Sequence, residues 1–181
     1  TIISQVVDGI SIVSFVSGEG SNSVLDGFTI TGGDLEIGQG AGIKCQNASP
    51  KIFNNRINNN ISPLGAGIDC DNYSSPIIAN NLIEQNAATS QGGGIRCSNY
   101  SSPAILGNVI LGNSATENGG GILCLNYCLP TITENKIVGN TAPSGYGGGI
   151  VLFNSSTADI TNNTIDRNSA LKGGGIFLDN T

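Results

Sequence analysis

The feature that most constrains this chain is a short pattern that returns about every 27 residues along nearly its whole length. It reads apolar, two residues, Asn, one residue, apolar, two residues, then Asn or Gly. Successive copies are 23, 27, 26, 27, 27 and 28 residues apart. A fixed period predicts a stack of equivalent units, each unable to bury its apolar side alone. The first apolar positions are Ile2, Leu25, Ile52, Ile78, Ile105, Ile132 and Ile160, and the second are Val7, Ile30, Ile57, Ile83, Ile110, Ile137 and Ile165.

A second pattern, Gly-(Gly/Ala)-Gly-Ile-x-(Cys/Leu), keeps step with the first. Together they predict three short strands per coil, joined by a turn that contains Asn, a tight turn and a variable loop. No segment keeps a 3.6-residue period, and Gly and Asn are too dense for helices. The second pattern begins at Gly40, Gly65, Gly92, Gly119, Gly147 and Gly173. The variable loops are expected at Ile61–Leu64, Ala87–Gln91, Ser114–Asn118, Thr141–Tyr146 and Ser169–Lys172.

The predicted fold is therefore all-β: one domain over residues 1–181, a solenoid of about seven coils of 23–28 residues. Parallel strands stacked ~4.8 Å apart place equivalent residues directly above one another. In a strand such as Ile43-Lys44-Cys45, alternation points Ile43 and Cys45 inward and Lys44 outward. Neither end of the sequence reads as a polar cap, so we expect both terminal coils to be open.

These residues resemble the repeats of right-handed parallel β-helix families over nearly the whole chain. The Gly-Gly-Gly-Ile and Ile-x-x-Asn pairing is similar to repeats of bacterial surface and autotransported proteins, including the polymorphic outer-membrane proteins. The resemblance implies a right-handed single-stranded β-helix. It is specific for fold and weakly specific for function, since pectate-lyase-like enzymes share the architecture.

Two series of asparagines are expected to form ladders along the axis. Stacked amides both donate and accept, which satisfies groups that would be costly to bury alone. We place these residues at turn corners, where Asn tolerates a left-handed backbone, and favour this structural interpretation over sugar-binding amides. The series are Asn55, Asn81, Asn108, Asn135 and Asn163, and Asn60, Asn86, Asn113, Asn140 and Asn168.

Four cysteines, Cys45, Cys70, Cys97 and Cys124, share one repeat position, which later coils fill with Leu152 and Leu178. Replacement by Leu indicates an apolar interior slot holding free thiols. A straight file of thiols does not make the tetrahedral cage that Zn²⁺ prefers, so no metal site is expected. Neighbouring coils bring cysteines within disulfide range, and Cys128 could pair with Cys124, so the redox state stays open.

The turn asparagines carry two further features. Tyr73, Tyr100 and Tyr127 each follow one of them, either as a stack that protects the edge or as an exposed file that binds carbohydrate. Asn-x-Ser/Thr triplets are glycosylation acceptors in a secretory setting, although the repeat alone explains their recurrence. They start at Asn47, Asn60, Asn72, Asn99, Asn154 and Asn162, with Asn47, Asn72, Asn99 and Asn154 as the candidate glycosylation sites.

The chain's composition argues against several kinds of chemistry. Seven Lys and Arg at a net charge of −6 cannot supply a basic stripe for nucleic acid. There is no run of apolar residues long enough for a membrane-spanning helix. Without His, the usual Ser and Cys triads cannot form. The best candidate for polysaccharide cleavage is the outward set Lys44, Asp69 and Arg96 with Asp71 nearby, which we interpret as a surface ion-pair ladder, so no catalytic or cofactor-binding residue is expected.

The outward column continues as Leu123, Val151 and Phe177, an apolar strip for a partner or for the chain's own loop. Ile2, Val7, Ile176 and Leu178 would lie in the end coils. Because Thr1 matches Asp159 in repeat phase, copies could stack head to tail, or the chain could continue into a longer β-helix. We therefore expect a non-enzymatic structural or adhesive module, extracellular or on the cell surface, with itself or glycans as partner. The alternative is a carbohydrate-active β-helix.

Overall fold

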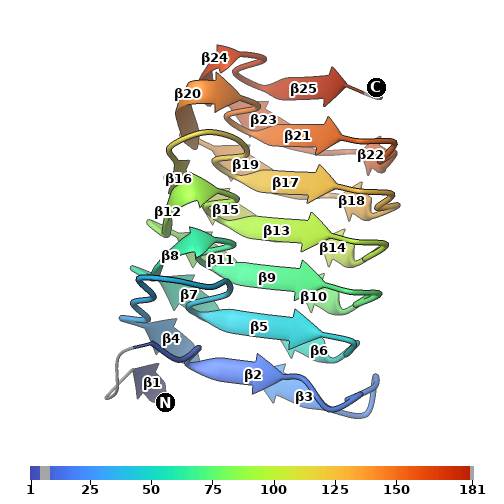
Figure 1. Cartoon of the computed structure of the whole chain (residues 1–181). Helices are drawn as coiled ribbons and strands as arrows, with labels where there is room; N and C mark the ends of the chain where they lie inside the picture. Colours follow the sequence, from blue (N-terminus) through green and yellow to red (C-terminus); the bar gives the residue numbers. More distant parts are fainter. Residues whose placement is uncertain (5–8, 180–181) are drawn as a thin grey trace.

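The computed structural model describes residues 1–4 and 9–179, and these residues form a column of stacked coils without any helix (Figure 1). Four parallel sheets, A to D, run along the column, and each strand pairs with the equivalent strand of the next coil. The all-β solenoid and its coil repeat are confirmed.

Each sheet takes one strand from each coil it spans. Sheet A contains β1 (Ile2–Ser4), β4 (Thr29–Thr31), β7 (Arg56–Asn58), β11 (Leu82–Glu84), β15 (Val109–Leu111), β19 (Lys136–Val138) and β23 (Thr164–Asp166). Sheet B contains β2 (Val13–Phe15), β5 (Ile43–Gln46), β9 (Ile68–Asp71), β13 (Ile95–Ser98), β17 (Ile122–Leu125), β21 (Ile150–Phe153) and β25 (Ile176–Asp179). Sheet C contains β3 (Val24–Asp26), β6 (Lys51–Phe53), β10 (Ile77–Ala79), β14 (Ala104–Leu106), β18 (Thr131–Thr133) and β22 (Asp159–Thr161). Sheet D contains β8 (Ile61–Leu64), β12 (Ala87–Gln91), β16 (Ser114–Ala115), β20 (Thr141–Tyr146) and β24 (Ser169–Lys172).

The core is a set of isoleucine files that run along the axis. In sheet A, Ile57 pairs with Ile83 and Ile83 with Ile110, and all three side chains are fully buried. Sheets B and C supply matching files, so like packs on like from coil to coil. Burying each such side chain contributes about 1.5–3 kcal/mol, and no single coil could enclose it alone.

The segments expected to be variable loops are strands. Their backbones pair in parallel to make sheet D, a fourth wall of the column. Unequal lengths are absorbed by register shifts, between Ala88 and Gln91 and between Ala142 and Tyr146. The inward residues of these strands are small, as at Ala88, Ala115 and Ala142, and a short file of alanines gives a weaker sequence signal than the isoleucine files of the other sheets.

The predicted phase of the first coil is wrong. Ile3, and not Val7, is the partner of Ile30, because β1 pairs with β4 as Ile2 with Thr29 and Ile3 with Ile30. The run from Ile2 to Val7 resembles the apolar-x-x-Asn-x-apolar motif by coincidence. Val7 itself lies outside the described residues. Thr1 is thus equivalent to Asn163 and not to Asp159, which removes the near-continuous register that had suggested head-to-tail stacking.

Both predicted asparagine ladders are present, and in their interior rungs the side-chain amides are fully hydrogen-bonded. Asn108, for example, donates from Nδ2 to Oδ1 of Asn135 (3.0 Å) and to the carbonyl of Ile78 (2.9 Å). Its Oδ1 accepts from the backbone N–H and Nδ2 of Asn81, at 2.9 and 3.0 Å. Each interior rung therefore joins three coils, and the buried amide leaves no polar atom unpaired.

The left-handed residues at these corners are not the ladder asparagines. They are the residues immediately before them, such as Asn80 (φ 57°) before Asn81 and Gly107 (φ 61°) before Asn108. The tight turn thus takes its positive φ from one residue and its axial hydrogen bonds from the next. Gln85, Glu134 and Arg167 fill the same left-handed place elsewhere, which is why that place carries no uniform sequence signal.

We predict that replacing Asn108 with Ala destabilises the fold by roughly 2–5 kcal/mol, because buried partners in the coils on both sides lose their hydrogen bonds. Urea unfolding followed by circular dichroism measures the loss. Asn22→Ala is the control: Asn22 is exposed at a turn and its φ is not positive, so the change should cost less than about 1 kcal/mol. Equal losses in the two variants would contradict the ladder's stabilising role.

Candidate functional site: the outer face of sheet B and its edge

The outward side chains of sheet B are covered, and the interpretation of Lys44, Asp69 and Arg96 as a surface ladder is wrong. Asp69 is fully buried, Arg96 is 7% exposed, and only Lys44 is partly open. The glycine turn before each strand lies directly against the middle side chain. A Cβ added at Gly65 or Gly92 would come within 2.7 Å of the Cβ of Asp69 or Arg96.

These charged groups belong to one polar network. Arg96 Nη1 donates to Asp69 Oδ1 at 2.7 Å and to Gln39 Oε1 at 3.3 Å. Gln39 in turn donates from Nε2 to Asp71 Oδ2 at 3.1 Å. Asp71 Oδ1 accepts from Ser98 Oγ and from Asn99 Nδ2, both at 2.7 Å. Lys44 stands next to Asp69 in the strand register but makes no ion pair with it.

The two carboxyl groups sit in opposite environments. Burial raises the pKa of Asp69 from its ordinary 3.8 to about 7, and the charge and hydrogen bond of Arg96 offset this only in part. Asp69 Oδ2 and Arg96 Nε are buried without a hydrogen-bond partner. Partial burial also acts to raise the pKa of Asp71, but hydrogen bonds from Ser98, Gln39 and Asn99 outweigh it and lower that pKa.

We predict that Arg96→Leu alone destabilises the chain by about 3–5 kcal/mol, because it leaves a buried carboxylate unpaired. The double variant Asp69→Leu/Arg96→Leu should be as stable as the wild type or more stable. Leu123 already fills this position one coil further along, where it is fully buried. Chemical denaturation of both variants measures the difference, and a double variant less stable than the wild type would contradict the prediction.

We predict a pH dependence of stability from Asp69. Below about pH 4 the carboxyl is protonated in folded and unfolded chains alike, so its burial carries no ionisation penalty. Between about pH 4 and 7 the unfolded chain releases this proton and the folded chain retains it, so the contribution to stability falls as pH rises. Urea midpoints across this range should show the loss, and Asp69→Asn should remove that part of the slope. An unchanged slope in Asp69→Asn would contradict the assignment.

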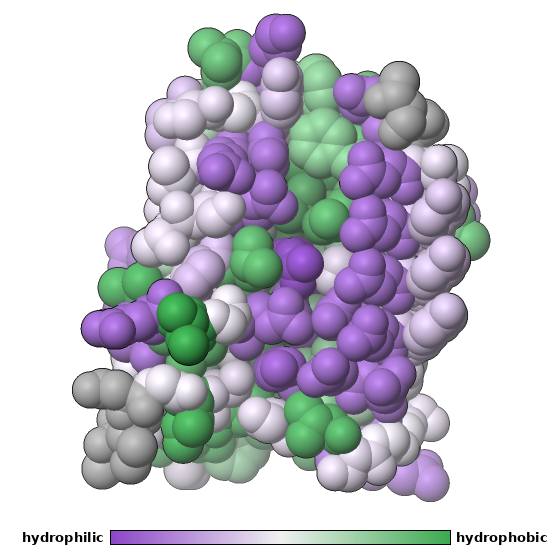
Figure 2. All heavy atoms as spheres, viewed as in Figure 1, coloured by the Kyte–Doolittle hydropathy of each residue, from purple (hydrophilic) through white to green (hydrophobic). Residues whose placement is uncertain are grey.

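The apolar end of the same outward column is mostly covered by the chain itself. Leu123 and Val151 are fully buried, so the expected exposed contact strip is not formed by these two residues. Phe177 is half-buried and stacks on Tyr146 at 4.6 Å between ring centroids, with Phe153 at 5.8 Å. Figure 2 shows apolar atoms gathered in the upper part of this face. Among the predicted contact residues, Ile2, Ile176 and Leu178 are exposed by 70%, 39% and 59%.

The cysteine file is buried inside sheet B, as its replacement by Leu had indicated. All five thiols are free. Hydrogen bonding with Cys45 and Cys97, together with burial, raises the pKa of Cys70 well above its ordinary value. Hydrogen bonding with Cys97, together with burial, likewise raises the pKa of Cys124. Cys97 lies between Cys70 and Cys124, and hydrogen bonds from both thiols lower its pKa. Cys128 fills the place of a turn serine: it donates to the carbonyl of Leu125 at 3.1 Å, and burial raises its pKa to about 12.

The turn after sheet B carries a third amide ladder that sequence reasoning missed. Asn154 Nδ2 donates to Asn126 Oδ1 (2.9 Å), Asn126 Nδ2 to Asn99 Oδ1 (3.0 Å), and Asn99 to the carboxylate of Asp71. The ladder lies along the carboxyl ends of the sheet B strands, where Figure 2 shows a hydrophilic column. The regular spacing of these asparagines was visible, but their side-chain direction was not.

A file of tyrosines follows this ladder. Tyr73 stacks on Tyr100 and Tyr100 on Tyr127, each pair with ring centroids 5.1 Å apart and planes 7° from parallel. The rings are exposed by 68%, 49% and 54% along the file. The predicted stack is therefore real, and it is also an exposed surface.

The comparisons with known proteins agree with this architecture. The family model for the right-handed β-helix region matches residues 8–137 and 82–181. The chain belongs to the right-handed β-helix family. Searches of curated proteins and of solved structures found no match.

The predicted glycosylation asparagines sit at different kinds of place on this β-helix. Asn47 and Asn154 are exposed, Asn72 and Asn99 are half-buried, and all four have φ of 51–52°. Asn60 is a fully buried ladder rung. The amides of Asn99 and Asn154 donate along the third ladder, and a sugar on either would replace one of the two hydrogens of that donor nitrogen.

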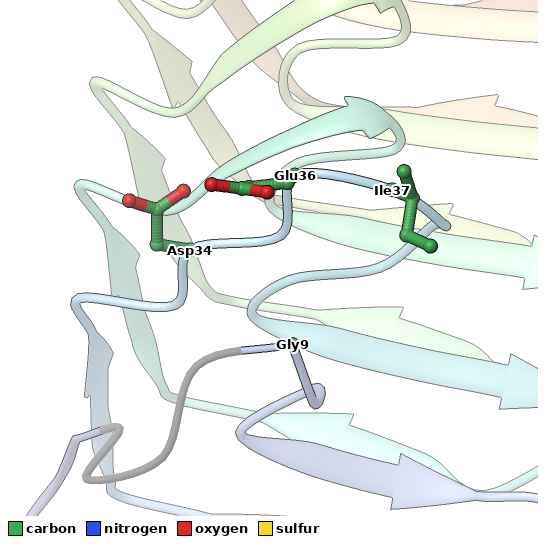
Figure 3. A pocket seen from close by; sticks show the side chains of 4 residues that line it. All are labelled: Gly9, Asp34, Glu36 and Ile37. Carbon is green, nitrogen blue, oxygen red and sulfur yellow. The ribbon is translucent and has the colours of Figure 1, made fainter.

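One hollow on the β-helix brings carboxylates together. It has a volume of about 390 Å³, lies beside the first coils and is lined by Gly9, Asp34, Glu36 and Ile37. Figure 3 shows the carboxylates of Asp34 and Glu36 on the same side of it, while Ile37 points away from them. Over residues 1–4 and 9–179, no three His, Cys, Asp or Glu side chains are grouped to hold a metal ion. The same residues contain no helix suited to crossing a membrane.

Proposed function

We propose that this β-helix is a rigid, non-enzymatic structural or adhesive module that works outside the cell or at its surface. The observation that carries the proposal is the use of its polar groups. Asp69 and Arg96 neutralise each other inside the wall, and Asp71 accepts three hydrogen bonds from its own chain. A polysaccharide cleavage site needs carboxyl groups that face the polymer, and the carboxyl groups of Asp69 and Asp71 do not.

The remaining polar chemistry also serves the column. Two buried amide ladders and one at an exposed turn run along the axis and stiffen successive coils against one another. Such a quasi-one-dimensional body suits a spacer or a surface support. The proposed location outside the cell rests on the resemblance of the repeats to those of bacterial surface proteins. A second point is that only 11% of the residues are charged, so few charges hinder lateral contacts.

The partner we propose is further β-helix, in a longer chain or a second copy, with glycans as a second class of partner. Exposed apolar side chains in the end coils, Ile2 and Leu178, support axial contact. The strand register of the first coil does not itself support this contact, because Thr1 is equivalent to Asn163 and not to Asp159.

The second candidate is a carbohydrate-active β-helix, and the hollow beside Asp34 and Glu36 is the observation that favours it. Paired carboxylates at a surface hollow are the minimum that glycoside cleavage requires. The hollow differs from the network around Asp71, so the two sites can be tested separately.

We predict no cleavage when the purified chain is incubated with a panel of acidic and neutral polysaccharides. Reducing ends and absorbance from unsaturated uronates are the measurements, and heat-denatured chain is the blank. Glu36→Gln and Asp71→Asn are the matched variants. Cleavage by the wild type that either variant abolishes would overturn the structural proposal, and Glu36→Gln would then identify the hollow as the active site.

A further inference from the structure

We propose that the tyrosine file is an oxidative cross-linking site, at which Tyr100 couples to Tyr73 or Tyr127 to form dityrosine between adjacent coils. The oxidant is hydrogen peroxide acting through a haem peroxidase. The reaction does not depend on the proposed function, but a support exposed to oxidants outside the cell would benefit from it.

The geometry prepares the rings for coupling. Adjacent centroids are 5.1 Å apart in both pairs, and the planes are nearly parallel. The backbone holds them there, because each tyrosine and the asparagine before it adopt left-handed conformations, as at Asn99 (φ 52°) and Tyr100 (φ 63°). A non-glycine residue in this region is strained, so its place is set by the stack and the turn hydrogen bonds around it.

The turn beneath the rings is fixed by hydrogen bonds from coil to coil. The backbone N–H of Tyr73 donates to the carbonyl of Asn99, and that of Tyr100 to the carbonyl of Asn126, both at 3.0 Å. Ser74 N–H donates to Ser101 Oγ at 3.1 Å on the inner side of the same turn. The Cα positions therefore cannot drift apart, and only the exposed side chains need to move for a bond to form.

No other exposed side chain competes for the oxidant. Besides tyrosine and cysteine, the side chains that oxidants attack most readily are those of Trp, Met and His, and the chain contains none of these three. Its five cysteines are all fully buried. The fourth tyrosine, Tyr146, is partly buried between Phe177 and Phe153 and has no tyrosine neighbour. One-electron oxidation is thus directed to Tyr73, Tyr100 and Tyr127.

The same stacking argues against a sugar platform at this file. A sugar ring binds aromatic residues through an open ring face, and here each inner face is covered by the next ring. What the file offers along its length is ring edges and phenol hydroxyls. The carbon atoms ortho to these hydroxyls lie at those edges, and they are the atoms that couple in dityrosine.

The chemistry balances. Each of two phenols loses one electron and one proton to give a phenoxyl radical. The radicals join through a new carbon–carbon bond between ortho carbons, and loss of the two ortho hydrogens as protons to the phenoxyl oxygens restores both aromatic rings. One hydrogen peroxide accepts the two electrons and two protons and leaves as two waters. The product lacks two hydrogen atoms relative to the starting chain.

The test treats the purified full chain with horseradish peroxidase and hydrogen peroxide at high dilution. We expect dityrosine fluorescence and a monomer mass lower by two hydrogens. Trypsin separates the two links, because Tyr73 lies in peptide 57–96 whereas Tyr100 and Tyr127 lie in peptide 97–136. A Tyr73–Tyr100 link joins the two peptides, and a Tyr100–Tyr127 link stays inside the second.

Tyr100→Phe is the decisive variant, because it keeps a ring in the stack and removes the phenol that both pairs share. We expect near-complete loss of intramolecular dityrosine in Tyr100→Phe, with an unchanged circular dichroism spectrum. Tyr73→Phe should retain only the link within peptide 97–136, and Tyr127→Phe only the link between the peptides. Persistent intramolecular product in Tyr100→Phe, product that requires Tyr146, or no product in the wild type would overturn the proposal.

Discussion

The structure depends on hydrogen bonds that run along the axis. Each interior ladder asparagine bonds to the coil before and the coil after its own. This arrangement removes the desolvation cost of placing polar corners inside the wall. It also dictates coils of nearly equal perimeter, since a rung that slid sideways would lose several partners at once. The isoleucine files then pack at the spacing that the ladders impose.

Much of the fold could be predicted from the sequence because residues at the same repeat position stack directly above one another. Ile57, Ile83 and Ile110 share a period, so they share a file, and the same reasoning placed Asn81 above Asn55 and Cys70 above Cys45. Where the sequence pattern lapsed, the prediction failed. The inward residues of sheet D are small alanines such as Ala88 and Ala115, and this short file of small side chains was not recognised as a strand repeat. In the first coil the residue pattern matched Val7 to Ile30, whereas the strand pairing matches Ile3 to Ile30.

The candidate site shows a different limit. The strand alternation correctly predicted that Asp69 and Arg96 point away from the core. However, side chains on the outer face of sheet B are not necessarily exposed to solvent, and these two are buried. The turn at Gly65 and the side chain of Gln39 close over them, and both come from parts of the coil whose position depends on the fold. The ion pair of Asp69 and Arg96, which we expected to be weak and solvated, is therefore buried, and the cost of desolvating both charges opposes it. The third amide ladder was missed for the related reason that side-chain direction at a turn is set by φ.

The column of sheet B that changes from Lys44 through Asp69 and Arg96 to Leu123 and Val151 has an evolutionary consequence. Each glycine turn touches mainly the middle side chain of its own coil, so that residue can vary without disturbing the neighbour's backbone. Each interior coil that carries both ladder asparagines also presents the same amide donors and acceptors to its two neighbours. A coil that does not contribute Asp69 or Arg96 is therefore exchangeable: duplication or deletion of about 27 residues in register there would lengthen or shorten the molecule and leave its cross-section unchanged.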